Sequence, residues 1–233
     1  MPITPMQLAE NRDSLKKLPS VETAINVLVS AAEFQPLPRG QIKFDRKPGA
    51  GTKGELWLRN SLVWLRTIPL QCGHYFVNLH AESPIYLTST KGRSFSADLL
   101  GLSYKNDGAK LCVVELKSGA SGDNLVYAIA EGGINLILSR KNLPQLMNHW
   151  RQHAEARAAW RKGNPFAKLE KADLVVLGDY AWLEANKSLK AKAGQLIKAI
   201  KARFGIDTYV LYFDKSVKPG SKPYRLLNIS RLI

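Results

Sequence analysis

The sequence lacks any long apolar run, and no stretch approaches the length of a membrane-spanning helix. Its amino terminus, MPITPMQLAENRD, has neither the basic start nor the apolar centre of a signal peptide. Only two cysteines occur in 233 residues, and Cys112 stands within an apolar segment, which favours reduced thiols over a disulfide framework. From these absences we expect a cytoplasmic protein that makes no membrane contact.

Motifs of several enzyme classes are also missing. There is no G-x-S-x-G nucleophile motif, and two distant cysteines make no zinc site. The segment GAGTKG, residues 49–54, matches G-x-G-x-x-G, but proline and lysine precede it where a dinucleotide site needs a strand. A milder role stays open, in which amides at a helix amino terminus, together with Lys53, hold a phosphate. His149 and His153 lack a third metal ligand nearby in sequence.

Acidic residues are scarce. The chain has 19 Asp and Glu against 34 Lys and Arg, a formal net charge of +15. Such an excess favours a polyanionic partner, and nucleic acid is the commonest soluble one. Any single lysine is more often a solvated surface residue, but as a set the basic residues predict phosphate contacts without base recognition. The candidate contacts are Lys53, Arg151, Arg157, Arg161, Lys162, Lys190 and Lys198.

Helical and strand patterns alternate along the chain. Helices are expected at 20–34, 54–68, 123–140 and 184–204, and strands at 74–80, 84–90, 172–178 and 208–214, with a hairpin between the second strand and the third helix. This order predicts an α/β fold with a mixed central β-sheet flanked by helices. We divide the chain into an N-terminal helical extension and basic loop, residues 1–50, and an α/β domain, residues 51–233.

The hairpin SFSADLLGLSYKNDGAKLCVVELKSG carries charges on otherwise apolar strands. Asn106-Asp107-Gly108 is the strongest turn signal in the chain. A turn centred between its first two residues places Asp98 opposite Glu115, and a turn formed by its last two places Asp98 opposite Lys117. Because side chains alternate with a period of two, all three charged residues share one face in either register.

Two carboxylates this close repel each other, which raises the pKa of at least one of them. A divalent cation between them removes the repulsion, and oxygen ligands favour Mg²⁺ or Mn²⁺ over zinc. The alternative is that Asp98 and Glu115 simply pair with Lys117 or with surface bases, as most charged residues on exposed strands do.

Asp98, sixteen further residues and then Glu115-Leu116-Lys117 resembles the motif of the PD-(D/E)xK nuclease superfamily. Ala97 stands where that motif often has proline. The resemblance implies a restriction-endonuclease-like core. It also implies that Asp98, Glu115 and the Leu116 carbonyl bind Mg²⁺ or Mn²⁺, and that Lys117 orients and polarises the attacking water.

Two helices offer further candidates. Glu55 shares a helical stripe with Leu58, Leu62 and Leu65 and should face the sheet, and the superfamily often has a glutamate near the metal on its first helix. The alternative is a surface ion pair between Glu55 and Arg59. On the helix at 123–140, Tyr127 and Glu131 share a stripe. The resemblance offers them as counterparts, at a different spacing, of a Gln and a Tyr that some superfamily members carry on this helix near the site. The alternative is that Glu131 is a satisfied buried glutamate.

Together these features predict a Mg²⁺-dependent phosphodiester hydrolase acting on duplex DNA, an endonuclease, with Asp98, Glu115, Lys117 and Glu55 in its catalytic site. Two alternatives stay open: a catalytically inactive nucleic-acid-binding protein on the same scaffold, or an RNA-directed nuclease. A homodimer is also left open.

Overall fold

The computed structural model describes residues 4–17, 20–34, 67–70, 74–86, 95–105, 108–119, 121–150, 171–213 and 229–231, with the single positions 55, 58, 59 and 62. Its helices are α1 (Pro5–Lys17), α2 (Val21–Glu33), α4 (Leu125–Lys141), α5 (Leu143–Trp150), α7 (Tyr180–Ala185), the 3-10 helix η1 (Lys187–Leu189) and α8 (Lys190–Phe204). Its strands are β1 (Thr67–Leu70), β2 (His74–Tyr86), β3 (Phe95–Lys105), β4 (Gly108–Lys117), β5 (Ala172–Gly178), β6 (Ile206–Phe213) and β7 (Ile229–Arg231).

The strands form one seven-stranded sheet in which each strand pairs with the next one along the chain. The β4–β5 and β5–β6 pairs are parallel, and all other pairs are antiparallel. Helix α4 follows β4 and α8 precedes β6, so both lie on crossovers of the parallel part. The predicted α/β class with a mixed sheet is therefore confirmed.

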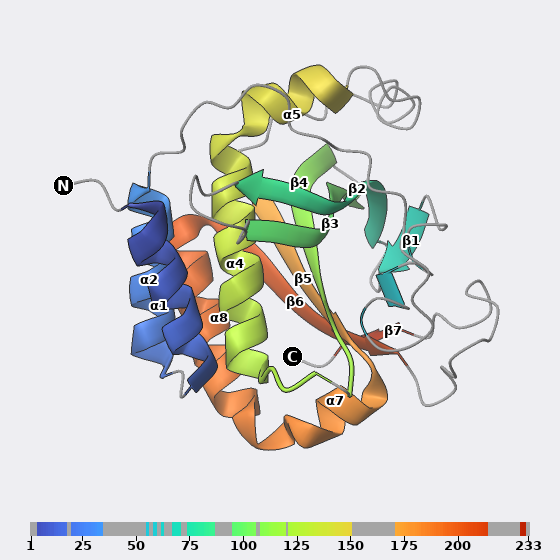
Figure 1. Ribbon diagram of the computed structural model, residues 1–233. Coiled ribbons are helices and arrows are strands. Elements are labelled where there is room, and N and C mark those ends of the chain that lie inside the picture. The colour runs from blue at the N-terminus through green and yellow to red at the C-terminus, as the bar shows by residue number, and fades with distance from the viewer. Residues whose placement is uncertain are drawn as a thin grey trace.

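Both faces of the sheet are covered. Along β4, Leu111 and Val113 belong to one buried cluster with residues of α1, α2, α4 and α8, whereas Cys112, Val114 and Leu116 belong to a second cluster that includes the helical residues Leu58 and Leu62. Figure 1 shows α4 lying between the sheet and the pair α1 and α2. Because the faces alternate residue by residue, Glu115 and Lys117 follow Val113 onto the face that α4 covers.

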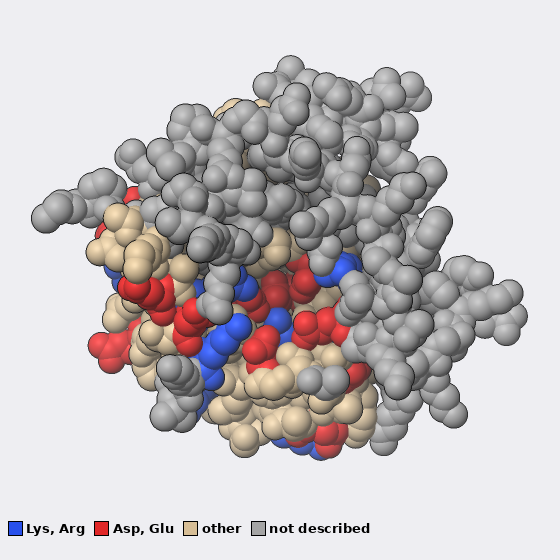
Figure 2. All heavy atoms as spheres, viewed as in Figure 1, with Lys and Arg blue, Asp and Glu red and all other residues tan. Residues whose placement is uncertain are grey.

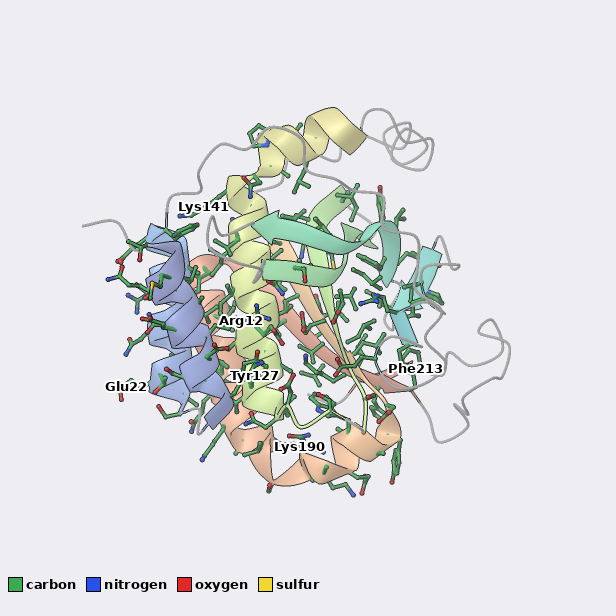
Figure 3. The ribbon with its side chains drawn as sticks, viewed as in Figure 1. Arg12, Glu22, Tyr127, Lys141, Lys190 and Phe213 are labelled. Atoms are coloured by element: carbon green, nitrogen blue, oxygen red, sulfur yellow. The ribbon has the colours of Figure 1, made fainter. Side chains whose placement is uncertain are left out.

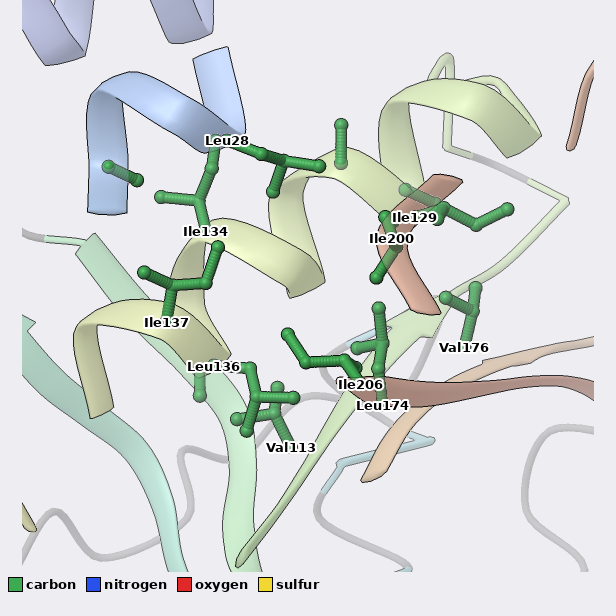
Figure 4. Close-up of a cluster of buried hydrophobic side chains, with 14 of the residues drawn as sticks. Leu28, Val113, Ile129, Ile134, Leu136, Ile137, Leu174, Val176, Ile200 and Ile206 are labelled. Atoms are coloured by element: carbon green, nitrogen blue, oxygen red, sulfur yellow. The ribbon is translucent and has the colours of Figure 1, made fainter. Parts of the chain in front are cut away.

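The N-terminal helices belong to the same hydrophobic core as α4. Ser20 caps α2 by accepting a hydrogen bond from the Thr23 amide at 3.0 Å. In Figure 4, Leu28 of α2 meets Ile134 of α4, while Leu136 of α4 lies over Val113 of β4. The sequence-based division at residue 50 stays a prediction, but α2 packs as part of the main core.

The adjacent glycines of α4 let it approach elements on both sides. A Cβ atom on Gly132 would stand 2.6 Å from Leu174 Cδ1 and 3.2 Å from Glu115 Cβ, and one on Gly133 would stand 2.8 Å from Leu28 Cδ2. Glycine inside a helix costs about 1 kcal/mol relative to alanine. Close packing on the sheet and on α2 offsets that cost and brings α4 near β4.

Two predicted element boundaries were wrong. The predicted strands at 74–80 and 84–90 are strand as far as Tyr86, but they form one continuous strand, β2, without the expected break at 81–83, and residues 87–90 lie outside the described residues. The pairing of β2 with β3 shifts register between Asn78 and His80 and between Pro84 and Tyr86. Such irregularities let one strand continue where a proline removes a backbone donor. Residues 67–68, expected to end a helix, instead begin β1. In the described part of the chain, no helix has the length and apolar character that crossing a membrane requires.

Candidate active site

The site forms where β3 and β4 separate. Lys105 pairs with Gly108, so the first of the two predicted registers is confirmed, and the ladder runs back to Leu99 opposite Val114. Strand β4 continues to Lys117, beyond that last pair. There the Leu116 amide donates a 2.8 Å hydrogen bond to Asp98 Oδ2 instead of to a strand carbonyl. The Asp98 carboxylate thus lies between the two strands, and its hydrogen bond with the Leu116 amide holds it at the end of β4.

Lys117 is buried among carboxylates. Its Nζ donates to Glu115 Oε1 and to Glu131 Oε2, each at 3.0 Å, and forms an ion pair with Asp123 Oδ2 at 3.2 Å. Only 3 % of Lys117 is exposed. An ammonium so enclosed is tolerated because each of its donors meets a charged acceptor.

Helix α4 completes the network around Glu115 and Glu131. Asn135 Nδ2 donates to Glu115 Oε2 at 3.3 Å and to the Ser96 carbonyl at 3.0 Å. The Tyr127 hydroxyl donates to Glu131 Oε1 at 3.1 Å. Both acidic side chains are therefore held from two sides, which restricts their rotamers and orients their remaining acceptor positions.

The pKa of Asp98 agrees with the predicted repulsion between the carboxylates of Asp98 and Glu115. Burial, and next the charge of Glu115, raise the pKa of Asp98 to about 8, while Lys117 and the Leu116 amide act in the opposite sense. Burial alone would lower the pKa of Lys117, but the charges of Glu115, Asp98 and Glu55 outweigh it and raise that pKa above its ordinary value. Lys117 therefore stays an ammonium at neutral pH, which suits a fixed positive charge and not a general base.

Glu55 lies on the inward side of its helical segment. Leu58 and Leu62, on the same stripe, are buried in the second core cluster. Glu55 Oε1 is buried, and no residue in the described part of the chain hydrogen-bonds to it. Its charge acts on both Asp98 and Lys117. Glu55 is thus brought to the site, and a buried carboxylate oxygen without a donor is suited to a cation.

The cluster carries an excess of negative charge within a strongly basic protein. Figure 2 shows Asp and Glu side chains gathered around Lys and Arg side chains in the middle of one face. The carboxylates near Lys117 are Asp98, Glu115, Asp123, Glu131 and Glu55. A set of carboxylates that outnumbers its basic partners attracts cations.

The donor set fits a hard divalent cation by ligand type and by charge, because Mg²⁺ and Mn²⁺ prefer carboxylate and carbonyl oxygens. Within the described residues, however, no three His, Cys, Asp or Glu side chains stand close enough together to hold a metal ion. The ammonium of Lys117 already contacts Glu115 at 3.0 Å, so in this arrangement part of the negative charge is neutralised by the protein itself.

Most of the predicted nucleic-acid contacts lie outside the described residues: Lys53, Arg151, Arg157, Arg161 and Lys162. Lys190 and Lys198 are exposed on α8. Neither lysine contacts the described carboxylates around Lys117, so neither belongs to the site.

Sequence reasoning missed Arg12, Asp123 and Asn135 and left Glu131 undecided. Arg12 of α1 donates to Glu131 Oε1, although the two residues are 119 positions apart. No local spacing signals such a contact. Asn135 was detectable, since it lies one helical turn beyond Glu131 on the stripe that faces β4.

Comparisons of the chain with family models, with curated proteins and with solved structures give no match. The case for a function therefore rests on the residues of the site.

If the protein cleaves phosphodiester bonds as its sequence predicts, we expect Glu55→Gln to lower that cleavage about 10- to 100-fold, the range typical of groups that support a metal site. It should leave the melting temperature unchanged or higher, because it removes a negative charge that acts on Asp98. Activity assays and thermal unfolding measure the two effects. If Glu55 serves Arg59 instead, Glu55→Gln and Arg59→Gln will lower the melting temperature alike and leave cleavage intact.

Proposed function

We propose that this protein is a divalent-cation-dependent nuclease that hydrolyses phosphodiester bonds of duplex DNA, with a restriction-endonuclease-like core around Asp98, Glu115 and Lys117. The observation that carries the proposal is the gap between the first residues of β3 and the last residues of β4. There Asp98 accepts a hydrogen bond from the Leu116 amide, and Lys117 lies 3.0 Å from Glu115. The order of strands β2, β3 and β4, helix α4 and strand β5 agrees with that core.

Asp98, Glu115 and the Leu116 carbonyl would hold the cation, with Glu55 as a further ligand, and the cation would polarise the phosphate as a Lewis acid. Lys117, kept charged by its neighbours, stabilises negative charge that develops on the phosphate. Glu131 and Asn135 hold Lys117 and Glu115 in place, so little reorganisation is needed when the substrate enters.

The choice of DNA rests on charge. The chain carries +15 overall, whereas the site itself is rich in carboxylates, so the basic residues lie largely outside the site. Such a distribution suits a long polyanion that binds over a broad surface while one phosphate reaches the acidic site. It carries no base-specific information.

Incubation with labelled single-stranded and duplex DNA and RNA, with Mg²⁺, with Mn²⁺ and with EDTA, tests the proposal. We expect cleavage of duplex DNA that requires the cation, and binding in EDTA whose affinity falls steeply with salt. If only RNA is cleaved, the proposed substrate must be changed from DNA to RNA. If binding affinity falls steeply with salt but no nucleic acid is cleaved, the result would favour the inactive nucleic-acid-binding protein. An affinity that does not change with salt would contradict the predicted phosphate contacts.

A further inference from the structure

Helix α1 presents two cations to the rim of the site. Arg12 donates to Glu131 Oε1, and Lys16 Nζ lies 5.6 Å from the centre of the Tyr127 ring. The two cations are four positions apart and therefore share one side of α1. Figure 3 places Arg12 and Tyr127 between α1 and α4.

Arg12 and Lys16 are closer to solvent than the buried charges Glu115 and Lys117. Glu115 and Lys117 are 4 % and 3 % exposed, whereas the side chain of Arg12 is 23 % exposed and Lys16 is exposed. A polyanion that approaches the site would be repelled by the carboxylates below. Asp123 is also closer to solvent than Glu115 and Lys117, since its side chain is 27 % exposed. The two cations offset part of the repulsion between these carboxylates and a phosphate.

Glu131 does not need Arg12 for its own hydrogen bonds. Glu131 Oε2 accepts from Lys117 and Oε1 accepts from Tyr127, so both carboxylate oxygens are satisfied from α4 and β4. Arg12 also lies between Leu8 and Leu15 on α1, and both leucines are fully buried in the core. An arginine at such a position gives up side-chain freedom, which a surface arginine keeps.

We propose that Arg12 and Lys16 bind the phosphate backbone of the substrate next to the phosphate that reaches Lys117. Glu131 holds one nitrogen of the Arg12 guanidinium at this position, and a guanidinium presents several N–H donors that suit phosphate oxygens. The Tyr127 ring supports the Lys16 ammonium through its face. The identity of the bound chain as nucleic acid rests on the proposed function, whereas the phosphate contact itself rests on α1.

The test uses the full-length protein with Arg12→Ala, Arg12→Lys, Lys16→Ala and the double variant Arg12→Ala/Lys16→Ala. The matched control, Lys171→Ala/Arg203→Ala, removes the same charge from two exposed cations near the opposite end of β5 and β6. Anisotropy of a labelled DNA duplex in EDTA at several KCl concentrations gives affinity and salt slope. Cleavage with Mg²⁺ gives KM and kcat.

We expect each single alanine variant to weaken duplex binding by about tenfold, the effect of one charge-assisted hydrogen bond. The slope of log affinity against log salt should fall by about 1 per lost contact. KM should rise while kcat changes by less than about threefold, since Lys117 keeps its partners. Arg12→Lys should restore part of the affinity. The charge control should weaken binding far less than the double variant.

Lys16→Ala keeps the test valid if Arg12→Ala unfolds the protein, because Lys16 is exposed and its contact is with one ring. The proposal would be overturned if Lys16→Ala and the double variant bound the duplex as tightly as the charge control does. It would also be overturned if these variants cleaved DNA faster than the parent protein, because α1 would then obstruct the site and not bind the substrate. If the unaltered protein cleaves no nucleic acid but the α1 variants still bind duplex less tightly, the proposed function fails while the phosphate contact stands.

Discussion

Asp98→Asn should abolish divalent-cation-dependent cleavage, with a loss of about 1000-fold or more. The substitution removes the charge that would hold the cation, on which both water activation and neutralisation of the phosphate depend. It preserves the fold, because the amide oxygen of asparagine still accepts the hydrogen bond that the Leu116 amide donates to Asp98. Cleavage of a labelled duplex under single-turnover conditions measures the loss, and DNA binding in EDTA should be retained or tightened.

The same variant should be more stable than the parent protein without metal, and more so as pH rises. The pKa of Asp98 is raised to about 8 in the folded protein, from an ordinary value of 3.8 in the unfolded chain. The folded state therefore keeps a proton that the unfolded state loses, so the contribution of Asp98 to stability is full below about pH 4 and is lost as pH rises to about 8. Asparagine has no such dependence.

Urea unfolding of both proteins at pH 5 and pH 8 should show a gain for Asp98→Asn of roughly 1–3 kcal/mol at the higher pH, because Asp98 is only half-buried and water screens part of its charge. Asp98→Ala, which leaves the Leu116 amide without its acceptor, should not show that gain. Cleavage by Asp98→Asn at the parent rate would contradict the metal-site proposal.

Lys117→Met should lose both cleavage and stability. Lys117 pairs with Glu115, Glu131 and Asp123, and removing one partner of a buried ion pair costs about 3–5 kcal/mol. Cleavage should fall about 100- to 1000-fold, the effect of removing one group that stabilises developing charge. Thermal unfolding and single-turnover cleavage measure the two losses.

A divalent cation should rescue the stability of Lys117→Met but not its activity. The carboxylates freed from the ammonium should bind Mn²⁺ at least as tightly as in the parent, so Mn²⁺ should raise the melting temperature of the variant by more than that of the parent. Isothermal titration gives the affinity directly. A melting temperature that Mn²⁺ does not raise further in the variant would contradict a cation site at these carboxylates.

Lys110→Met is the matched control. Lys110 also lies on β4 and pairs with two carboxylates, Asp173 at 2.9 Å and Asp207 at 3.1 Å, at the end of the strand away from the site. Its loss should lower stability and leave cleavage within about threefold of the parent, because Lys110 touches no residue of the site. Equal losses of cleavage in both variants would mean that the effect of Lys117→Met arises from instability.

The charged face of the hairpin could be predicted because its geometry is local. The Asn-Asp-Gly sequence predicted a register that the pairing of Lys105 with Gly108 confirms, and alternation along β4 puts Glu115 and Lys117 on one face. The contact between Asp98 and the Leu116 amide could not be predicted, since it depends on where the ladder ends and not on spacing. The same limit applies to β1 and β2, whose bounds depend on pairing partners.

Contacts between residues far apart in the chain could not be predicted from hydrophobic periodicity, for a different reason. Arg12 reaches Glu131 only because α1 packs on α2 and α4 through Leu8 and Leu15. Periodicity finds the inward side of a helix but not the element that it meets. The stripe on α4 marked Glu131 as inward, and it took the placement of α1 to show that this glutamate links two other elements.

The placement of α1 has a consequence for cooperativity. Every strand pairs with its neighbour in the chain, so the pairing of the sheet does not involve α1. The described contacts of α1 include its two fully buried leucines, Leu8 and Leu15, the ion pair of Arg12 with Glu131 and the Lys16 ammonium against the Tyr127 ring. An element with so few buried groups opens at a lower free energy than the strands beneath it. Local opening would then remove two phosphate-binding cations while the sheet stays folded. Nucleic acid bound at the rim would close that opening, so slower amide hydrogen exchange along α1 would report occupancy of the site.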